Sequence, residues 1–429
     1  MGSVERIKHV ADLITREEGN FVVLSAMSGT TNSLIEISDY LYNKNPDGAC
    51  ETIARMEDSY LRHCKGLFHK EDYLEKAQNF VHGVFDYLRT FAKNLFSSTE
   101  EKLIVAQGEL LSTNLMTFYL QQCGLNPVLL NALDFMKKDS QGEPDAEFIQ
   151  NRLKELMAAN PDAPLYITQG FICRNLHGEV DNLLRGGSDY TASLVGAALG
   201  VEEIQIWTDI DGMHNNDPRI VEGTSAVRHL HFDEAAELGY FGAKILHPTC
   251  IQPAKYANIP VRLLNTMDPD APGTIINNVK ESASIKAIAA KDNITAIRIK
   301  SSRMLLAYGF LRKVFEIFES YQTSIDMICT SEVGVSVSID NTLHLNEIVH
   351  DLKKYGTVSV DLDMCIVCVV GDMDWENVGF ESKAMEAMTD IPVRMVSYGG
   401  SNNNISFLVK EEDKNRALRS LSKCLFENA

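Results

Sequence analysis

The stretch that decides the fold is LLRGGSDYTA, from Leu183 to Ala192. Its paired glycines come directly before a segment with helical composition that runs to Leu199. Glycine lets a ligand come close to the backbone, and the N–H groups at a helix start attract anions. Arg185 adds a guanidinium fork that suits a carboxylate, and Asp189 offers a negative charge for an ammonium group. The alternative is an ordinary glycine-rich turn with capping side chains, but an Arg directly before the glycine pair favours a ligand site.

Around this stretch, through the first two thirds of the chain, short apolar runs alternate with segments of helical period. Strands that alternate with helices predict an α/β fold, in which a mainly parallel central sheet is sandwiched by helices. The segment 48–96 has no strand pattern and predicts a helical insertion. A helix is expected from Glu100 to Gln122, with a capping box formed by Ser98 and Glu101. The expected strands are Phe21–Met27, Pro127–Asn131, Leu165–Cys173, Glu203–Asp211 and Ile259–Asn265.

The remainder of the chain repeats a shorter pattern. The dipeptides Gly309-Phe310 and Gly379-Phe380 each follow an expected strand and open an expected helix, after which come two strands and a further helix. The order βαββα occurs twice, which predicts two small α+β modules. We therefore expect one domain over residues 1–280, including the insertion, and a tandem module over residues 285–429. The CxxC pair of Cys365 and Cys368 lies in an apolar run and predicts a buried strand rather than a zinc site.

Composition and charge exclude several classes of protein. The chain has 429 residues, with 40 Lys and Arg against 59 Asp and Glu, and a net charge of −19. Nucleic acids and anionic membranes bind clustered positive charge, so we expect neither as a partner. Nine cysteines without a framework spacing predict reduced thiols. The apolar stretches are too short to cross a bilayer and no signal-peptide pattern is present, which predicts a cytoplasmic protein.

The common nucleotide motifs are absent from the sequence. No two of the 27 glycines are two or five residues apart, which excludes the GxGxxG and Walker loops. A nucleotide would have to bind at other junctions rich in Gly, Ser, Thr and charged residues. An ordinary capped helix is an equal alternative for the first of these junctions, and a Lys near a helix end often only compensates the helix dipole. The junctions are Ser25–Asn32, Trp207–Gly212 with Asn216–Arg219, and Phe241–Pro248.

Taken together, these segments resemble the aspartate kinases, a family with the amino acid kinase fold. VLSAMSGTTN, QGELLS, ITQGF, LLRGGSDYTA, WTDIDG with NDPR, and FGAKILHP occur in the order and spacing typical of that family. The resemblance covers essentially the whole chain, because the C-terminal repeat is similar to the family's pair of ACT modules. It implies transfer of the γ-phosphoryl group of ATP, with Mg²⁺, to the β-carboxylate of L-aspartate, the committing step towards lysine, threonine and methionine.

The resemblance also implies which residues form the site. Arg185 would hold the α-carboxylate of the substrate, while Glu109 and Asp189 would orient it. A carboxylate with a pKa near ~3.9 is already ionised at neutral pH, so catalysis needs positioning and charge neutralisation rather than a general base. At His214, family members often carry an aromatic hydroxyl. The aspartate side would be lined by Ser25, Thr31, Glu109, Phe171, Arg185, Gly186, Ser188 and Asp189, and the ATP side by Thr208, Asp209, His214, Arg219, Lys244 and Ile245.

The ACT modules imply regulation by an end-product amino acid, usually lysine and in some members also threonine. Asp326 would meet the cationic group of this effector. Ala307 stands where the lysine-sensitive pattern often has a hydroxyl residue, which leaves both amino acids open. ACT modules usually pair across chains, so a homodimer is expected. The implied effector-binding residues are Met304, Gly309, Phe310, Leu311, Ser324, Ile325, Asp326, Ser331, Glu332 and Val333.

The sequence departs from the family at its start. Family members open with a strand that ends in Lys-Phe-Gly-Gly-Thr-Ser, whereas here Met1-Gly2-Ser3 comes directly before the helix expected near Val4. The family's lysine contacts the transferred phosphoryl group, and loss of one such donor commonly lowers a rate ~10²–10³-fold. One interpretation is an internal methionine of a longer, ordinary kinase, which we favour because every other site element is retained. The other is a catalytically weak, amino-acid-sensing subunit.

Overall fold

The computed structural model describes residues 1–16, 19–93, 96–183, 186–242, 246–282, 284–301 and 308–426. The chain divides into two compact units. The first consists of Met1–Ile204 with Thr249–Ile259, and the second of Gln205–Pro248 with Pro260–Ala429. Over the described residues, none of the helices is long and apolar enough to cross a membrane.

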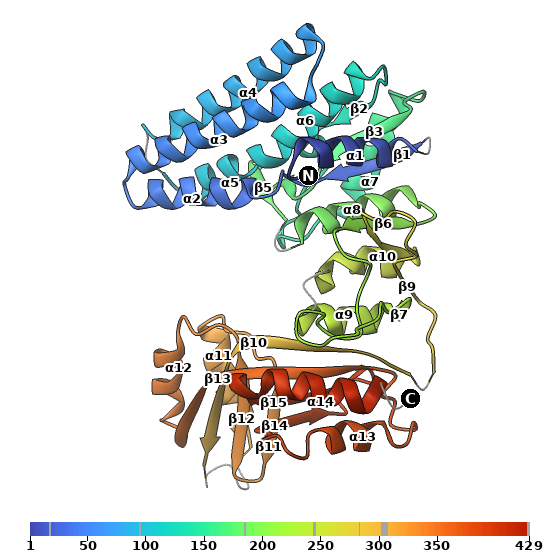
Figure 1. Ribbon diagram of the computed structural model, residues 1–429. Helices are drawn as coiled ribbons and strands as arrows, with labels where there is room; N and C mark the ends of the chain where they lie inside the picture. The colour runs from blue at the N-terminus through green and yellow to red at the C-terminus, as the bar shows by residue number, and fades with distance from the viewer. Residues whose placement is uncertain are drawn as a thin grey trace. The chain divides into compact units, whose positions relative to one another are not determined.

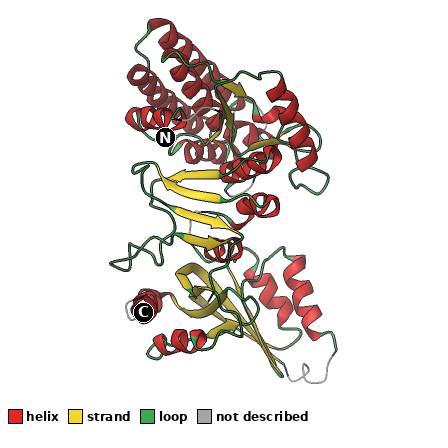
Figure 2. Cartoon of the chain, turned by 90° about the vertical axis from the view of Figure 1, so that its right-hand side faces the viewer, coloured by secondary structure: helices red, strands yellow, loops and turns green. Residues whose placement is uncertain are grey.

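The first unit is mainly helical and contains a short parallel sheet (Figures 1 and 2). Its helices are α1 (Val4–Ile14), α2 (Thr30–Tyr42), α3 (Pro46–Leu67), α4 (Glu71–Phe91), α5 (Ser98–Val105), α6 (Gln107–Gln122), η1 (Ala132–Asp134), α7 (Ala146–Ala158), α8 (Gly187–Leu199), most of η2 (Pro248–Ile251) and α10 (Gln252–Ala257). Its strands are β1 (Asn20–Leu24), β2 (Val128–Leu130), β3 (Leu165–Gln169), β4 (Ile172–Arg174) and β5 (Val180–Asn182).

The parallel sheet of this unit positions the chain segments that follow it. Its strand order is β1-β3-β2, and both pairs are parallel, as the sequence predicts. All five residues of β3 are buried, because helices cover both faces of the sheet. Parallel strands end at the same edge of a sheet, where open α/β sheets bind ligands. The loops after β1 and β3 therefore lie beside each other, and the Gly170 N–H donates to the Leu24 carbonyl at 3.0 Å.

The single strand predicted over Leu165–Cys173 is wrong, because the backbone turns between β3 and β4. Phe171 has a φ of 66°, a left-handed conformation outside the extended range of a regular strand. The start of α8 packs against this turn, and a Cβ added at Gly170 would lie 2.4 Å from Ser188 Oγ. The apolar pattern continues across the turn since both strands are buried, and for this reason the pattern alone does not reveal the break.

The single helix predicted over Glu100–Gln122 is also wrong, because α5 ends at Val105 and α6 begins at Gln107. The capping box lies one residue earlier than expected. The Ser97 side chain accepts from the Thr99 N–H, and the Glu100 carboxylate accepts from the Ser97 N–H at 2.9 Å. The start of α6 lies against the loop after β1, where a Cβ added at Gly108 would lie 2.9 Å from Ala26 Cβ.

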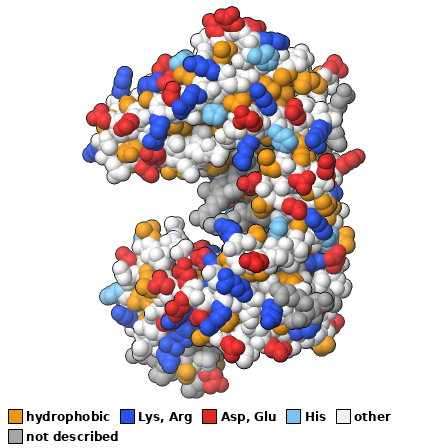
Figure 3. Space-filling view, in the orientation of Figure 1, with side chains coloured by type: hydrophobic (Ala, Val, Ile, Leu, Met, Phe, Trp, Pro, Cys, Tyr) orange, Lys and Arg blue, Asp and Glu red, His pale blue; other side chains and the backbone are white. Residues whose placement is uncertain are grey.

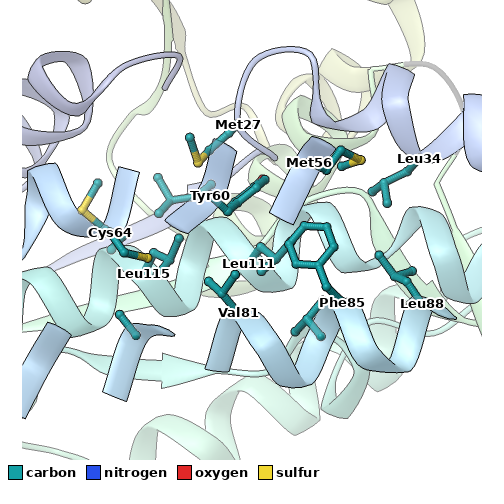
Figure 4. Packing of buried hydrophobic residues seen from close by; sticks show 14 of the residues in the cluster. Met27, Leu34, Met56, Tyr60, Cys64, Val81, Phe85, Leu88, Leu111 and Leu115 are labelled. Atoms are coloured by element: carbon teal, nitrogen blue, oxygen red, sulfur yellow. The ribbon is translucent and has the colours of Figure 1, made fainter. Parts of the chain in front are cut away.

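The expected helical insertion contains α4 and most of α3, which lie side by side in Figure 1. Their apolar faces pack on α2 and α6. Figure 4 shows this core, in which Tyr60, Phe85, Leu88 and Leu111 point toward one another. Phe85, Leu88 and Leu111 are fully buried, so the insertion forms one continuous core with the helices between β1 and β2.

The second unit contains two sheets (Figure 1). The smaller sheet has the order β6-β8-β9-β7, with a parallel β7–β9 pair and an antiparallel β8–β9 pair. Its elements are β6 (Ile204–Thr208), β7 (His229–His231), α9 (Phe232–Tyr240), β8 (Val261–Asn265) and β9 (Thr274–Asn277). The larger sheet and its helices consist of β10 (Ile285–Lys300), α11 (Phe310–Ser320), β11 (Ile328–Ser331), β12 (Gly334–Ile339), α12 (Leu345–Leu352), β13 (Thr357–Gly371), α13 (Phe380–Ala387), β14 (Met395–Tyr398), β15 (Asn404–Lys410), η4 (Glu411–Asp413) and α14 (Lys414–Phe426).

The larger sheet confirms the predicted repeat and adds one feature to it. The order βαββα occurs twice, and each first helix begins after a left-handed glycine, Gly309 with a φ of 81° and Gly379 with a φ of 96°. The two copies share one antiparallel sheet with the order β11-β12-β10-β13-β15-β14. Its central pair, β10 and β13, has 16 and 15 residues and is longer than the sequence predicts. The two copies are therefore joined in one sheet through β10 and β13.

Strand β13 is buried on both faces. Cys365, Val367 and Val369 pack with α13 and α14, while residues between them face the side on which α9 lies. Cys365 and Cys368 are fully buried, which confirms the buried strand predicted for the CxxC pair, and burial raises the pKa of both thiols. α9 and the smaller sheet belong to the same compact unit as the repeat. The boundary between the two compact units therefore does not coincide with the domain limits expected at residues 280 and 285. Those limits remain a prediction.

The surface carries charges of both signs. On the face shown in Figure 3, acidic and basic side chains are interspersed over both parts of the chain. Several of them form exposed ion pairs, such as Arg55 with Glu36 and Arg62 with Asp58. Exposed pairs of this kind contribute little to stability, about 0–1 kcal/mol each, so the apolar cores described above hold the fold.

We expect Gly170→Ala to destabilise the first unit, because the added Cβ would lie 2.7 Å from the Ser188 backbone and cannot be accommodated by a side-chain rotation. The expected loss in the free energy of unfolding is about 1–3 kcal/mol, measured by urea unfolding followed by circular dichroism. Gly83→Ala is the matched control, because Gly83 lies in α4 with nothing near its Cβ position. It should be neutral or stabilising by up to about 1 kcal/mol. Equal effects of the two substitutions would contradict this packing.

Candidate active site

The loop after β1 begins the candidate aspartate side in the first unit. Ser25 is exposed, and its carbonyl accepts a hydrogen bond from the Ser112 hydroxyl of α6 at 2.8 Å. On the other side of the loop, Leu24 accepts from Gly170. The loop is therefore held between α6 and the turn after β3. Thr31 follows it in the first turn of α2 and is half-buried.

Glu109 is the most unusual group of this region. It lies in the first turn of α6 with 4% of its surface exposed, and its Oε1 accepts from the Ala26 N–H at 3.3 Å. Its Oε2 is buried and has no hydrogen-bond partner. Burial raises the pKa of this carboxyl to about 7, although hydrogen bonds from the backbone oppose the shift. A buried carboxylate oxygen without a donor is costly, and such a position suits a ligand that brings a donor.

The start of α8 closes this region from another side. Gly186 has a φ of 72° and precedes α8, and a Cβ added at Gly187 would lie 2.5 Å from Phe171 Cδ2. The Phe171 N–H donates to Thr191 Oγ1 at 3.1 Å, which ties the turn after β3 to the helix. Asp189 lies in the first turn, and burial raises the pKa of its carboxyl to about 6.

The structure thus brings most of the predicted aspartate-side residues to neighbouring segments of the first unit. Arg185 lies outside the described residues. The sequence analysis missed Ala26, Ser112 and Gly170, which hold the segments together. The signal for Gly170 was present, because a glycine that ends a strand inside the segment ITQGF indicates a close approach of backbone. Those brought together are Ser25, Glu109, Phe171, Gly186, Ser188 and Asp189.

The candidate ATP side lies in the second unit. Thr208 ends β6, and its hydroxyl accepts from the Ile210 N–H at 3.1 Å, which turns the chain sharply beyond the strand. The Thr208 carbonyl accepts from the Thr266 N–H at 2.7 Å and so fixes this turn to the segment after β8. Asp209 is exposed at the top of the turn.

Arg219 is held in place by Asp217. Its Nε and Nη2 donate to the two carboxylate oxygens at 3.0 and 2.7 Å, in the bidentate geometry of a guanidinium with a carboxylate. The hydrogen bond to Arg219 lowers the pKa of Asp217, although burial opposes the shift. The Arg219 side chain remains 80% exposed, so its outer face is open to a ligand.

For the other predicted ATP-side residues, the structure describes fewer contacts. The His214 Nδ1 lies 2.9 Å from Thr224 Oγ1, so one ring nitrogen already has a partner. Lys244 and Ile245 lie outside the described residues. Just before them, Gly242 has a φ of 116°, and a Cβ at this position would lie 2.0 Å from the Ala290 carbonyl oxygen of β10. The FGAK segment therefore begins in contact with the large sheet.

The loop that carries Arg219 is also fixed to the repeat. Asn216 is 3% exposed, and its side-chain amide donates to the Leu418 carbonyl of α14 at 3.1 Å. The Arg419 Nε donates to the Ile220 carbonyl at 3.2 Å, and the Ile288 N–H of β10 donates to the Asn215 carbonyl at 2.9 Å. No local sequence signal predicts these three contacts, because their partners lie far apart in the chain.

The predicted effector-binding residues differ in their burial, and their role stays a prediction. Phe310 is buried, and with Ile325 it belongs to the core beneath α11. Glu332 and Val333 are exposed in the turn between β11 and β12. The Asp326 side chain is only 1% exposed and faces α9 instead. Gly309, Leu311, Ser324 and Ser331 are exposed, and Met304 lies outside the described residues.

Comparison with known proteins places this architecture in a family. The profile of the amino acid kinase family matches residues 1–265, and that of the ACT domain matches residues 367–425. The whole chain is 34% identical to aspartokinase 1, chloroplastic, of Arabidopsis thaliana, over 79% of that protein. The chain belongs to the aspartokinase family. It is therefore an aspartate kinase with the amino acid kinase fold and ACT-type modules, which confirms the fold, the enzyme class and the use of ATP and aspartate predicted from the sequence.

The chain is also similar over nearly its whole length to an aspartokinase of a bacterium. Lysine-sensitive aspartokinase 3 of Escherichia coli (strain K12) is 30% identical over 97% of this chain and 95% of its own length. The crystal structure of E. coli aspartokinase III in complex with aspartate and ADP, in the R-state, has a TM-score of 0.87 at 29% identity and covers 99% of this chain and 97% of its own. The T-state structure of the same enzyme, in complex with lysine and aspartate, has a TM-score of 0.80 over the same shares of both chains.

The raised pKa of Glu109 predicts a specific dependence of stability on pH. An unfolded glutamate titrates near ~4.3, so between that pH and about 7 the folded chain keeps a proton that the unfolded chain releases. The stabilisation is complete below ~4.3 and is lost as the pH rises through about 7. Relative to Glu109→Gln, which cannot ionise, the wild type should lose about 2–3 kcal/mol between pH 5 and pH 8 in urea unfolding.

Glu51→Gln is the control for this measurement, because Glu51 is exposed on α3. Its difference in stability from the wild type should be the same at both pH values. If the difference in stability between Glu109→Gln and the wild type were also the same at both pH values, the pKa of the Glu109 carboxyl would not be raised by its burial.

Proposed function

We propose that Glu109 receives the ammonium group of L-aspartate in this aspartokinase. The single observation that supports this role is the buried Oε2 of Glu109, which has no hydrogen-bond partner. An ammonium group would donate to this oxygen and would stabilise the ionised carboxylate. Because the pKa of the unliganded carboxyl is raised to about 7, binding of aspartate near neutral pH would release a proton.

The other aspartate-side residues surround this point. Asp189 supplies a second, half-buried carboxylate in the first turn of α8, and Ser188 beside it and Ser25 in the loop after β1 supply hydroxyl groups. Thr31 in the first turn of α2, Phe171 in the turn after β3 and Gly186 before α8 would complete the aspartate side. Arg185 holds the α-carboxylate of the substrate, a role that rests on the resemblance to the family alone. With both charged groups of the amino acid held, the β-carboxylate is left free to react.

In the reaction, a β-carboxylate oxygen of aspartate attacks the γ-phosphorus of ATP, and the bond from that phosphorus to the bridging oxygen breaks. The products are 4-phospho-L-aspartate and ADP. The attacking carboxylate carries no proton at neutral pH, so no general base takes part. The protein positions the two substrates and supplies positive charge, as is usual in enzymes that transfer phosphoryl groups.

The ATP side contributes the positive charge. Arg219, held in its position by Asp217, would contact the phosphates with its exposed face. Thr208, Asp209 and His214 line the nucleotide, together with Lys244 and Ile245, whose roles rest on the resemblance. Mg²⁺ would neutralise the phosphates. Over the described residues, no group of three or more His, Cys, Asp or Glu could hold a metal ion.

We propose feedback regulation by lysine, or by lysine and threonine, through the ACT repeat. Its support is the physical connection between the repeat and the loop of Arg219, through Asn216 and Ile220. We also propose that the chain forms a homodimer through the ACT repeat. Leu311 and Phe315 lie one turn apart on α11 and are 38% and 40% exposed, which is unusual for two apolar neighbours on one helix face.

The experiment that tests the function is ATP-dependent formation of aspartyl hydroxamate from L-aspartate and hydroxylamine, with L-glutamate as the control substrate. Turnover with aspartate and not with glutamate is the expected result, and inhibition by added lysine or threonine would identify the effector. No turnover, together with a lysine-dependent rise in melting temperature, would instead favour the amino-acid-sensing subunit.

Substitutions at the two sides should affect different substrates. Glu109→Gln should raise KM for aspartate about 10–100-fold, because the neutral amide replaces an ionic partner of the ammonium group. In the wild type, KM for aspartate should rise as the pH falls below about 7, because Glu109 becomes protonated, and Glu109→Gln should lack this rise. Arg219→Gln should raise KM for ATP and leave KM for aspartate nearly unchanged. The assignment of the two sides would be wrong if each variant changed both constants equally.

The dimer proposal has its own test. Phe315→Glu should convert the dimer to a monomer in size-exclusion chromatography with light scattering, because a charge replaces an apolar contact. Arg312→Glu, at an exposed neighbouring position of α11, is the control for added negative charge on the same helix. A wild-type chain that is monomeric at micromolar concentration would contradict the proposal.

A further inference from the structure

Tyr60 is a buried tyrosine of the helical insertion whose hydroxyl pairs with a residue outside that insertion. It lies on α3 with 4% of its surface exposed, and its ring packs against Phe85 of α4 at a centroid distance of 5.7 Å, in the core shown in Figure 4. The hydroxyl lies 2.7 Å from Thr30 Oγ1 at the start of α2, in a hydrogen bond to which either group could contribute the hydrogen. A phenylalanine would fill the same core, so packing alone does not explain why this position carries a hydroxyl.

Thr30 connects this hydroxyl to the candidate aspartate side. It follows Gly29, which has a φ of 81°, and comes directly before Thr31, one of the predicted aspartate-side residues. Its N–H donates to the Met27 carbonyl at 3.0 Å and so closes the turn of the loop after β1. Only 5% of Thr30 is exposed, so water cannot readily replace Tyr60 as the partner of its hydroxyl. Tyr60 thus fixes the side chain at the end of this loop.

Thr30 also lies against the start of α6, the helix that carries Glu109. A Cβ added at Gly108 would lie 3.3 Å from Thr30 Cγ2 and 2.9 Å from Ala26 Cβ, so α2, α6 and the loop after β1 are in close contact. The next residue, Glu109, accepts the Ala26 N–H through its Oε1. Burial raises the pKa of the Tyr60 hydroxyl, and the charge of Glu109 adds to this shift, although the hydrogen bond to Thr30 opposes it. The pair of hydroxyl groups and the Glu109 carboxylate therefore lie within electrostatic range of each other.

We propose that Tyr60 is a positioning residue for the substrate aspartate, which acts through Thr30 on the loop after β1 and on the first turn of α6. The inference rests on the proposed role of Glu109 and extends it to the helical insertion, which supplies none of the predicted site residues. Without the Tyr60 hydroxyl, Thr30 Oγ1 would be buried without its partner, and the loop would shift to pair it elsewhere. Such a shift moves Ala26 and with it the Glu109 carboxylate, and a binding group has to be held within ~0.5 Å of its productive position by the residues around it.

The test compares KM for aspartate, KM for ATP and kcat of the full chain in the aspartyl hydroxamate assay. Tyr60→Phe keeps the ring and removes only the hydroxyl, and Thr30→Val replaces the other hydroxyl by a methyl group of similar size. Each should raise KM for aspartate about three- to tenfold and leave KM for ATP and kcat within about twofold of the wild type. Tyr87→Phe is the matched control, because Tyr87 lies on α4 of the same insertion and is 40% exposed, and it should leave all three constants unchanged.

Further variants distinguish positioning from a general loss of structure. The double variant with Tyr60→Phe and Thr30→Val should raise KM for aspartate no more than the larger single effect, because both substitutions remove the same hydrogen bond. Thr30→Ser keeps a hydroxyl and should recover most of the affinity for aspartate that Thr30→Val loses. In the Glu109→Gln background, Tyr60→Phe should change KM for aspartate less than about twofold, because the group that it positions no longer carries a charge.

The possible results separate this inference from the proposed role of Glu109. If Glu109→Gln raised KM for aspartate and Tyr60→Phe did not, the inference would be overturned and the role of Glu109 would stand. If Tyr60→Phe lowered kcat and raised both KM values by the same factor, its hydroxyl would only support the fold, which would also overturn the inference. An effect of Tyr60→Phe that persisted in the Glu109→Gln background would do the same, because Tyr60 would then act on another group. If neither variant changed KM for aspartate, both proposals would be rejected.

Discussion

The antiparallel pairing of β10 with β13 is the constraint on which much of the second unit depends. These two strands join both copies of the repeat, and their faces support α9 on one side and the helices α13 and α14 on the other. The loop of Arg219 is attached to the same body through Asn215, Asn216 and Ile220. A change in the large sheet therefore reaches the candidate ATP side through direct packing, without a flexible linker. This arrangement gives an allosteric signal a short and rigid physical route.

The first unit has a different feature, which is a pair of desolvated carboxyl groups at the candidate aspartate side. Glu109 and Asp189 both lie in the first turn of a helix, where the helix dipole favours negative charge, yet burial raises the pKa of both. Their pKa values show that desolvation has the larger effect. Carboxyl groups that are costly to ionise without a ligand gain most from a ligand that brings positive charge. The desolvation cost would therefore contribute to selectivity for such a ligand.

Much of the architecture could be predicted from the sequence, and the errors have physical causes. Strand positions and the βαββα order follow from apolar periodicity, which reports burial along one segment. The same periodicity does not reveal the left-handed Phe171 that separates β3 from β4, because both strands are equally buried. It also does not reveal that β10 and β13 extend into one shared sheet, since the added residues, such as Asp361 and Asp363, are polar. For the candidate site, motifs located the residues, but not the partners of Glu109 and Asp326, which come from distant parts of the chain.

The shared sheet also bears on how the repeat could change over evolutionary time. Two copies that each formed a separate sheet could be lost, exchanged or shuffled one at a time. Here each copy supplies a long central strand to the other, so deletion of either would leave a long strand edge unpaired, and such edges promote aggregation. Two halves that pair in this way depend on each other. Selection would then act on the pair as a single heritable unit, within which each copy is free to diverge in sequence but not to disappear.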